Sequence, residues 1–334
     1  MPTEDRQKTL RAHIDNGGNG LRPVMTNING DNSWLISFPR PAAERVSAGR
    51  SYYHVVLEPW LAEPGYAVFV APWFSRTHRN CVAAATDGAS VDAVVREIEQ
   101  AAGSAGHAAA GVDAIFIFYT TTDHEHRQTL LTFAPSVPVF AVPEAAKRIS
   151  GWGHFDCVVD MATFDGTSSW RASHPGVPLP GWLSAMSLKT HFHCFGFALM
   201  WSRDDEKHEA ILSFPHGFRP EKDTSIVESL LGASPPLRIL AMMHPLKESF
   251  VWGALLSPGV RNGLQLWRMA GPKYWANTAD MEFIYTGVFM WGVNDKRHTL
   301  DWALKLEQNE TRADANLARP NLVNIENGAC YVLE

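Results

Sequence analysis

The sequence has few cysteines, no long apolar run and no block of like charge. Its cysteines form no C-x-x-C pair, its polar N-terminus lacks the apolar core of a secretory signal, and no stretch reaches the roughly 18 apolar residues of a membrane span. The 29 basic and 35 acidic residues are interspersed, which gives a net charge of -6 and no basic patch. We therefore expect an intracellular, cytoplasmic protein whose partners include neither nucleic acid nor a membrane. The cysteines are Cys81, Cys157, Cys194 and Cys330.

Several common catalytic signatures are also missing. The chain contains no G-x-S-x-G, no P-loop, no G-x-G-x-x-G after a strand and no H-E-x-x-H. What it has instead is a large apolar content, 46% of 334 residues, with 12 tryptophans and 17 phenylalanines. Aromatic side chains on this scale fill a core or wall an apolar pocket, so a small-molecule substrate is the expected partner.

The most informative stretch runs from Val112 to Phe133. Its first part, up to Phe118, is almost entirely large and apolar, which predicts a strand buried on both faces. Residues with hydroxyl, carboxyl and imidazole groups follow the predicted strand directly. They would lie at its carboxyl end, which is where open α/β sheets bind their ligands. The polar side chains delivered there are Tyr119, Thr121, Asp123, His124 and His126.

The remaining pattern predicts an α/β protein with one domain over residues 26–310. Residues 1–25 are polar and are expected to form a flexible segment outside the core, residues 311–334 a tail, and residues 161–184 a connection without an assigned element. Ser90 is a plausible N-cap for a helix. Strands are predicted at 34–38, 52–57, 112–118, 137–142, 157–159, 193–201, 209–214 and 237–242, and helices at 90–100, 143–149, 261–269 and 301–306.

The segment from Tyr119 to His124 resembles the first signature of the metallo-β-lactamase superfamily, H-x-H-x-D-H. Asp123 and His124 match it, whereas Tyr119 and Thr121 stand in place of the first two histidines. Further segments resemble a fungal branch of that superfamily in their order and spacing, across most of residues 26–300. The resemblance implies a four-layer αββα sandwich. The segments are Asn29–Pro41, Leu57–Trp60, where Glu58 replaces an Asp, Trp73–Ser75, Trp152–Phe155, Pro215–Gly217 and Lys273–Trp275.

The resemblance also implies a metal centre that has lost ligands here. In the superfamily two metals lie side by side, and a divalent metal lowers the pKa of bound water towards about 7. Such a catalytic site needs at least three protein ligands. Neither Tyr119 nor Thr121 is an ordinary zinc ligand, and Ala279 stands where the resembled family has its last histidine. A normal two-metal centre is therefore not expected.

A single weak site is the most that the resemblance leaves. Asp123 and His124 keep family positions, and His193 and His216 are the further candidate ligands. We expect either no cofactor or one weakly bound divalent metal, which would be zinc, iron or manganese. A structural alternative is that Asp123 is an N-cap and His124 a satisfied polar residue. His244, at a strand end, is expected to bond a carbonyl rather than to act in chemistry.

The site residues have expected roles. Asp123 or His124 would take a proton, and the phenol of Tyr119 would donate one or stabilise an oxyanion, which needs no metal. Trp73, Thr121 and Tyr274 are expected to contact the substrate.

Three functional hypotheses follow. The first is an enzyme of specialised metabolism that performs acid–base chemistry (elimination, isomerisation, cyclisation or hydrolysis) on a small, largely apolar molecule. The second is a mononuclear metal-dependent hydrolase, and the third is a non-catalytic protein that binds a small molecule. The sequence does not predict the oligomeric state.

Overall fold

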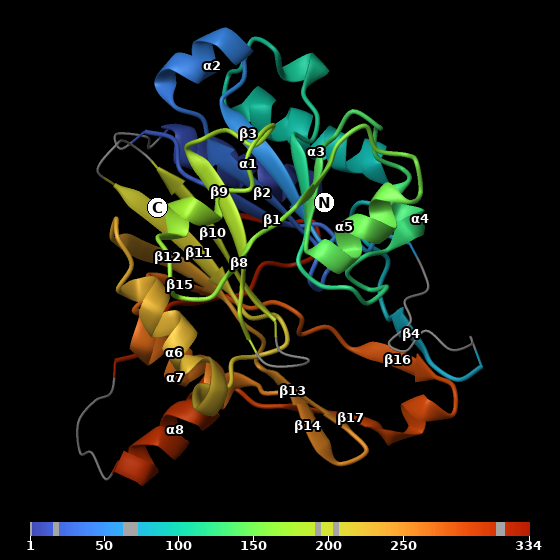
Figure 1. Ribbon diagram of the computed structural model, residues 1–334, viewed down its shortest axis with the longest axis vertical. Helices are drawn as coiled ribbons and strands as arrows, with labels where there is room; N and C mark the ends of the chain where they lie inside the picture. Colours follow the sequence, from blue (N-terminus) through green and yellow to red (C-terminus); the bar gives the residue numbers. More distant parts are fainter. Residues whose placement is uncertain (1, 16–19, 63–72, 191–194, 203–206, 312–317) are drawn as a thin grey trace.

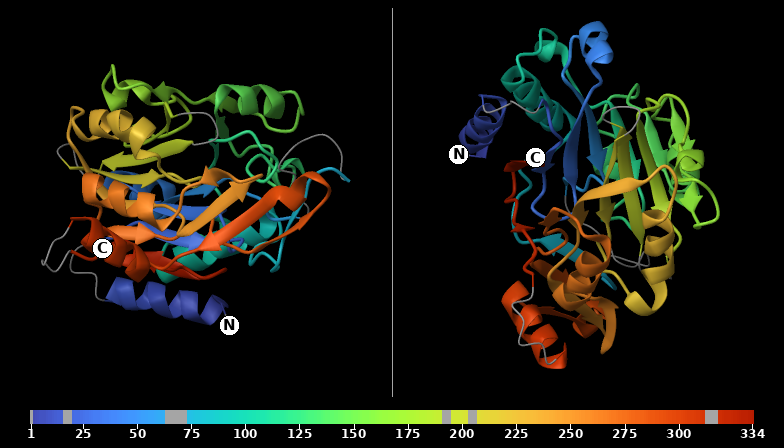
Figure 2. Two further views of the ribbon diagram at one scale, coloured as in Figure 1. Left: turned by 90° about the horizontal axis from the view of Figure 1, so that it is seen from below. Right: turned by 90° about the vertical axis from the view of Figure 1, so that its left-hand side faces the viewer.

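Two sheets that face each other form the body of the protein. The computed structural model describes residues 2–15, 20–62, 73–190, 195–202, 207–311 and 318–334 (Figure 1). Within these residues, each of the two sheets has seven strands, and helices lie outside them (Figure 2). No helix in the described ranges is long and apolar enough to cross a membrane.

The first sheet combines an antiparallel half with a parallel half. Its order is β19-β1-β2-β3-β5-β6-β7, and β3, β5, β6 and β7 are mutually parallel. The strands are β1 (Val24–Asn27), β2 (Trp34–Pro39), β3 (Tyr52–Leu57), β5 (Ala114–Ile117), β6 (Val139–Ala141), β7 (Val158–Asp160) and β19 (Cys330–Val332). The helices in this part of the chain are α1 (Pro2–Asp15), α2 (Ala42–Ala48), α3 (Gly88–Ala101), α4 (Arg127–Leu130) and α5 (Pro143–Ser150), with the 3₁₀ turn η1 (His107–Ala109).

The second sheet is built in the same way. Its order is β18-β15-β12-β11-β10-β9-β8, and the run from β11 through β12 and β15 to β18 is parallel. The strands are β8 (Thr163–Phe164), β9 (Leu183–Leu188), β10 (Gly196–Ser202), β11 (His208–Ser213), β12 (Leu237–Met243), β15 (Tyr274–Ala276) and β18 (Leu322–Val323). The helices are α6 (Pro220–Leu231), α7 (Val260–Ala270) and α8 (Leu300–Thr311), with η2 (Trp170–Ser173).

Two small sheets extend from this sandwich at its lower end in Figure 1. One has the order β14-β13-β17, with β13 (Lys247–Val251), β14 (Ala254–Ser257) and β17 (Val293–Arg297). The other pairs β4 (Arg76–Arg79) with β16 (Phe283–Thr286), and η3 (Phe289–Gly292) follows β16. None of these strands was predicted.

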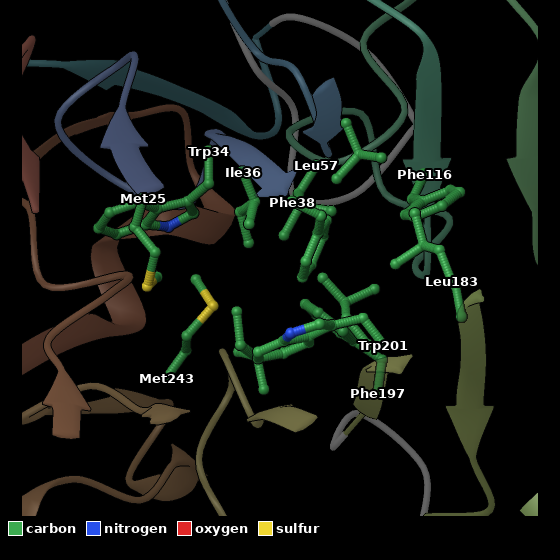
Figure 3. Close-up of a cluster of buried hydrophobic side chains, with 14 of the residues drawn as sticks. Met25, Trp34, Ile36, Phe38, Leu57, Phe116, Leu183, Phe197, Trp201 and Met243 are labelled. Atoms are coloured by element: carbon green, nitrogen blue, oxygen red, sulfur yellow. The ribbon is translucent and has the colours of Figure 1, made fainter. Parts of the chain in front are cut away.

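The main core lies between the two large sheets. In β2, Trp34, Ile36 and Phe38 point into this core, where they meet Trp201 and other side chains of the second sheet (Figure 3), while Leu35 packs beneath the helices. This alternation is the period of a strand whose two faces are both buried. The strand β5 behaves in the same way, as predicted, although it is shorter than expected.

A buried polar network links the first sheet to α3. Glu99 accepts hydrogen bonds from the backbone N–H groups of Ser51 (2.8 Å) and Tyr52 (2.9 Å) and lies 2.9 Å from Nε2 of His54. The Nδ1 atom of His54 lies 2.8 Å from Oγ of Ser37. Although burial alone would raise it, the hydrogen bond and charge of His54 lower the pKa of Glu99 to about 2. This network fixes α3 against β2 and β3.

Some predicted boundaries were wrong. The N-cap of α3 is Asp87, which accepts from Ser90 N in a capping box, so the predicted cap residue Ser90 occupies N3 instead. The polar N-terminal segment contains the helix α1, whose Leu10 is buried. Residues 161–184 contain β8, η2 and the start of β9. The expected tail contributes an edge strand to each sheet, as β18 and β19.

Candidate active site

The candidate site is a pocket at the carboxyl ends of the central strands. Glu58 follows β3, the segment from Tyr119 to His124 follows β5, and His216 follows β11. Parallel strands present their carboxyl ends at one edge of a sheet, which is where open α/β sheets bind ligands. The pocket has a volume of about 330 Å³. Its apolar wall includes Val251, Leu256, Phe283, Phe289, Met290 and Val293.

A chain of one carboxylate and two imidazoles leads into this pocket. Nδ1 of His124 lies 2.7 Å from Oε2 of Glu58, and its Nε2 lies 3.1 Å from Nε2 of His216. His124 and Glu58 are almost fully buried, whereas His216 is partly exposed and lines the pocket. A carboxylate on one ring nitrogen fixes the tautomer and orientation of an imidazole, so Glu58 directs the other nitrogen of His124 towards the pocket.

Glu58 is held in place from three sides. Its Oε2 accepts a hydrogen bond from the side-chain amide of Asn32 (2.8 Å), its Oε1 accepts one from Phe118 N (3.2 Å), and its own carbonyl accepts one from Ser33 Oγ (2.8 Å). Its φ of 45° lies in the left-handed region, which is rare for a residue with a long side chain. Because the surrounding bonds determine this conformation, the carboxylate is positioned before any ligand arrives.

The charge around His124 is set by its carboxylate neighbours. Burial alone would lower the pKa of His124, but the charge of Glu58, with that of Asp123, raises it from 6.5 to about 9. An Oδ2 atom of Asp123 lies 3.7 Å from His124 Nε2. The side chain of Asp123 is one-third exposed and lines the pocket, while its Oδ1 atom is buried without a hydrogen-bond partner in the described residues.

The aromatic ring of Tyr119 packs among these groups. It stacks on Phe195 at 4.7 Å between ring centroids and meets the rings of His124 (5.3 Å) and His216 (5.0 Å) edge-on. Thr121 lines the pocket beside it, with an Oγ1 atom that is buried and has no hydrogen-bond partner in the described part of the chain. The two residues that replace histidines of the resembled signature therefore both lie at the site.

A second group of polar side chains includes Lys247 and Tyr285, which line the pocket. Nζ of the buried Lys247 donates to Met281 O (2.7 Å) and lies 3.5 Å from Oδ2 of Asp295. The hydroxyl of Tyr285 donates to the same carboxylate oxygen at 2.9 Å. Asp31, also buried, lines the pocket near both polar groups, and burial raises its pKa.

The other predicted residues lie elsewhere. Trp73 is 68% exposed and does not line the pocket. Tyr274 is buried in the core, where its hydroxyl donates to Glu334 O (3.1 Å). His193 lies outside the described residues. Nδ1 of His244 donates to Pro245 O (2.8 Å), and burial lowers its pKa to about 4, so this histidine has the structural role that was expected.

Sequence reasoning did not assign a role to several pocket residues. Glu58 was noted only as a replacement, and Asp31, Lys247 and Tyr285 were not considered. A signal for Glu58 existed, because it directly follows a predicted strand, and parallel strands bring their carboxyl ends together. Lys247 had no such signal, since it begins a strand of a small sheet that the sequence pattern did not predict.

Two solved structures resemble this chain over almost its whole length. A possible metal-dependent hydrolase from Veillonella parvula matches with a TM-score of 0.53 at 12% identity, over 94% of this chain and 100% of that chain. The isothiocyanate hydrolase from Delia radicum gut bacteria matches with a TM-score of 0.52 at 13% identity, over 93% and 99%. The chain has a metallo-hydrolase fold. This confirms the predicted αββα sandwich. No protein-family model matches the sequence, and neither does any curated protein.

The described residues do not form a metal site in this arrangement. Among them, no group of three or more His, Cys, Asp or Glu side chains is placed to hold an ion. Tyr119 and Thr121 offer hydroxyl groups where the resembled signature has imidazoles, and Ala279, which lines the pocket, offers no donor. Nε2 of His124 and Nε2 of His216 lie 3.1 Å apart, within hydrogen-bond distance of each other.

Proposed function

We propose that this protein is an enzyme that performs acid–base chemistry on a small, largely apolar molecule, with the metallo-hydrolase fold as its scaffold. The observation that carries the proposal is the chain from Glu58 through His124 to His216, which ends at a mostly apolar pocket. The reaction class is elimination, isomerisation, cyclisation or hydrolysis. Each of these reactions moves a proton onto one oxygen or carbon and removes a proton from another.

The geometry suggests a division of roles between the carboxylate and the imidazoles. Asp123 reaches the pocket and would take a proton from the substrate. His124, held by Glu58, would pass a proton through His216 to the atom that gains negative charge. Tyr119 would support that charge from the side, because its ring packs against both imidazoles. The substrate loses one proton to Asp123 and gains one through His216, and proton exchange with solvent then restores the starting protonation states of both groups.

The test is turnover on a panel of small apolar esters, lactones, β-hydroxy ketones and isothiocyanates. Asp123→Asn and His124→Gln should each lower turnover of the best substrate by about a hundredfold or more, the usual contribution of an acid or base. Asp156→Asn, which removes an exposed carboxylate, is the matched control and should retain full turnover. Retained turnover in both site variants, with folded protein by circular dichroism, would refute the proposal.

A second candidate function is a mononuclear metal-dependent hydrolase. It is favoured by the contact between Glu58 and His124, since carboxylates commonly orient metal-bound imidazoles in this way, and by the unpartnered Oδ1 of Asp123. It would require Asp123, His124 and His216 to converge on one ion, and a bound divalent metal would supply hydroxide at neutral pH. Metal analysis of protein purified without chelator separates the candidates. Stoichiometric zinc, iron or manganese, with turnover lost to chelator and restored by metal, would favour the second.

A further inference from the structure

The charged groups around the pocket do not balance. Two cations are present, His124 and Lys247, and each already has a carboxylate of its own: Glu58 lies 2.7 Å from His124, and Asp295 lies 3.5 Å from Lys247. A second contact of Lys247, to the backbone carbonyl of Met281, uses another of its protons. Both cations of the site are therefore already paired with carboxylates of the protein.

Two further carboxylates line the pocket. No Lys or Arg nitrogen of the described residues lies within ion-pair distance of Asp31 or Asp123; the nearest charged nitrogen to Asp123 is Nε2 of His124, at 3.7 Å. Asp31 is 7% exposed, and its one hydrogen bond is a long contact of 3.4 Å from Met281 N to Oδ1. Its Oδ2 has no hydrogen-bond partner among the described residues. A buried carboxylate with a single long hydrogen bond is costly, so its second oxygen is suited to a ligand that brings a donor.

Aromatic side chains also line this pocket. Phe283, Tyr285 and Phe289 line the pocket, and Nζ of Lys247 already lies over the ring of Phe283, at 4.6 Å from its centroid. Aromatic faces attract ammonium groups and do not attract carboxylates. The pocket is therefore a small apolar cavity that is lined by two carboxyl groups and by aromatic rings.

We infer that the ligand of this pocket is a small apolar molecule that carries a protonated amine, which is bound between Asp31 and Asp123. This inference rests on the proposed function for the identity of the site and adds the chemical class of its substrate. Asp31 is a specificity-determining residue in this arrangement, because it accepts from the ammonium without taking part in the proton transfers. Anionic molecules of the same size should bind poorly, since they would meet the carboxyl groups of Asp31 and Asp123, and the nearby cations His124 and Lys247 each lie beside a carboxylate of the protein.

The experiment compares matched ligands by calorimetry on the full chain, with chelator present throughout. The panel contains several apolar bodies, each as a primary amine, an alcohol and a carboxylate, for example 2-phenylethylamine, 2-phenylethanol and 3-phenylpropionate. At neutral pH the best amine should bind about tenfold or more tightly than its alcohol, and its carboxylate should not bind. Asp31→Asn should remove this preference and retain alcohol binding, because asparagine keeps an oxygen for Met281 N.

A control variant and three possible outcomes distinguish this inference from the proposed function. Glu326→Gln removes an exposed carboxylate outside the pocket and should preserve the preference for amines. A panel in which no amine binds more tightly than its alcohol would overturn the inference, and so would displacement of bound amine by stoichiometric zinc once chelator is removed. If amines are preferred but Asp123→Asn leaves turnover unchanged, only the acid–base proposal fails. If Asp123→Asn abolishes turnover but no amine is preferred, only the ligand class fails.

Discussion

Replacing Glu58 by Gln should change both the charge of His124 and the stability of the fold. The carboxylate of Glu58 is the main reason that the pKa of His124 is about 9 rather than 6.5, despite burial. A shift of this size corresponds to about 3 kcal/mol of stabilisation. Gln keeps the shape and its oxygen still accepts from Phe118 N, so the change isolates the charge. Without that charge, burial should bring the pKa of His124 down towards 6.5 or below.

The pH dependence follows from the direction of this shift. Because the pKa of His124 in the folded protein lies above that of the unfolded chain, the stabilisation is complete below pH 6.5 and is lost as the pH rises through about 9. Wild type should therefore exceed Glu58→Gln in unfolding free energy by about 3 kcal/mol near pH 6, and by much less near pH 10.

Denaturant unfolding of chelator-treated protein across this pH range measures the difference. NMR titration of the histidine ring protons gives the pKa of His124 directly. Glu326→Gln, which removes an exposed carboxylate, is the control and should follow wild type at every pH. A stability difference between wild type and Glu58→Gln that stays constant from about pH 6 to about pH 10 would show that Glu58 does not hold a protonated imidazole.

Three further predictions concern stability. Gly217→Ala should cost about 2 kcal/mol or more and lower turnover, because Gly217 has a φ of 84° and an added Cβ would lie 2.1 Å from the carbonyl oxygen of Pro258; thermal unfolding and a turnover assay check this. Glu99→Gln should lower the unfolding free energy by about 3 kcal/mol, because it leaves His54 without its carboxylate. Since the pKa of Glu99 is lowered to about 2, the stabilisation from Glu99 should be present above pH 4.5 and lost as the pH falls towards 2. Unfolding titrations of wild type measure this loss. His244, whose pKa is lowered to about 4, should stay neutral in the folded protein at pH 6 and should reduce stability as the pH falls from 6.5 towards 4; a histidine resonance that titrates near 6.5 in its place would contradict this.

The sequence predicted the layered part of the fold because burial leaves a clear pattern there. The strands around Trp34–Phe38 and Tyr52–Leu57 contain apolar residues on both faces, and the structure places them in the first sheet. The small sheets could not be predicted in this way. Their strands are only half-buried, and β17 consists largely of polar and charged residues, so that neither a strand period nor a helix period stands out.

Local structure was hardest to predict where only tertiary contacts determine it. Helix α1 is mostly polar; among its side chains whose burial is described, Leu10 joins the core, and Arg6 pairs with Glu97 of α3. Such a helix is stabilised mainly by its packing against the rest of the protein, and the sequence of the helix alone gives little sign of that packing. The helix α6, which was not predicted, does have a signal in the sequence, since Pro220 occupies its first turn and Ile226 and Leu230 are spaced for one face.

Only the part of the candidate site that is contiguous in sequence could be predicted. Tyr119, Asp123 and His124 are neighbours in sequence, so one motif contains them all, and the structure places them around one pocket. The contact between Glu58 and His124 joins residues 66 positions apart. It depends on the parallel pairing of β3 with β5, which a single sequence does not state.

The short segment near the carboxyl end of the chain supplies an edge strand to each of the two large sheets. Strand β18 pairs with β15 at the border of one layer, strand β19 pairs with β1 at the border of the other, and Leu333 N donates to Pro23 O. Shortening the polypeptide before residue 318 would uncover a row of unpaired amides and carbonyls on each layer. Exposed rows of this kind recruit strands from neighbouring molecules, so trimmed variants designed for crystallisation should self-associate instead of becoming better behaved.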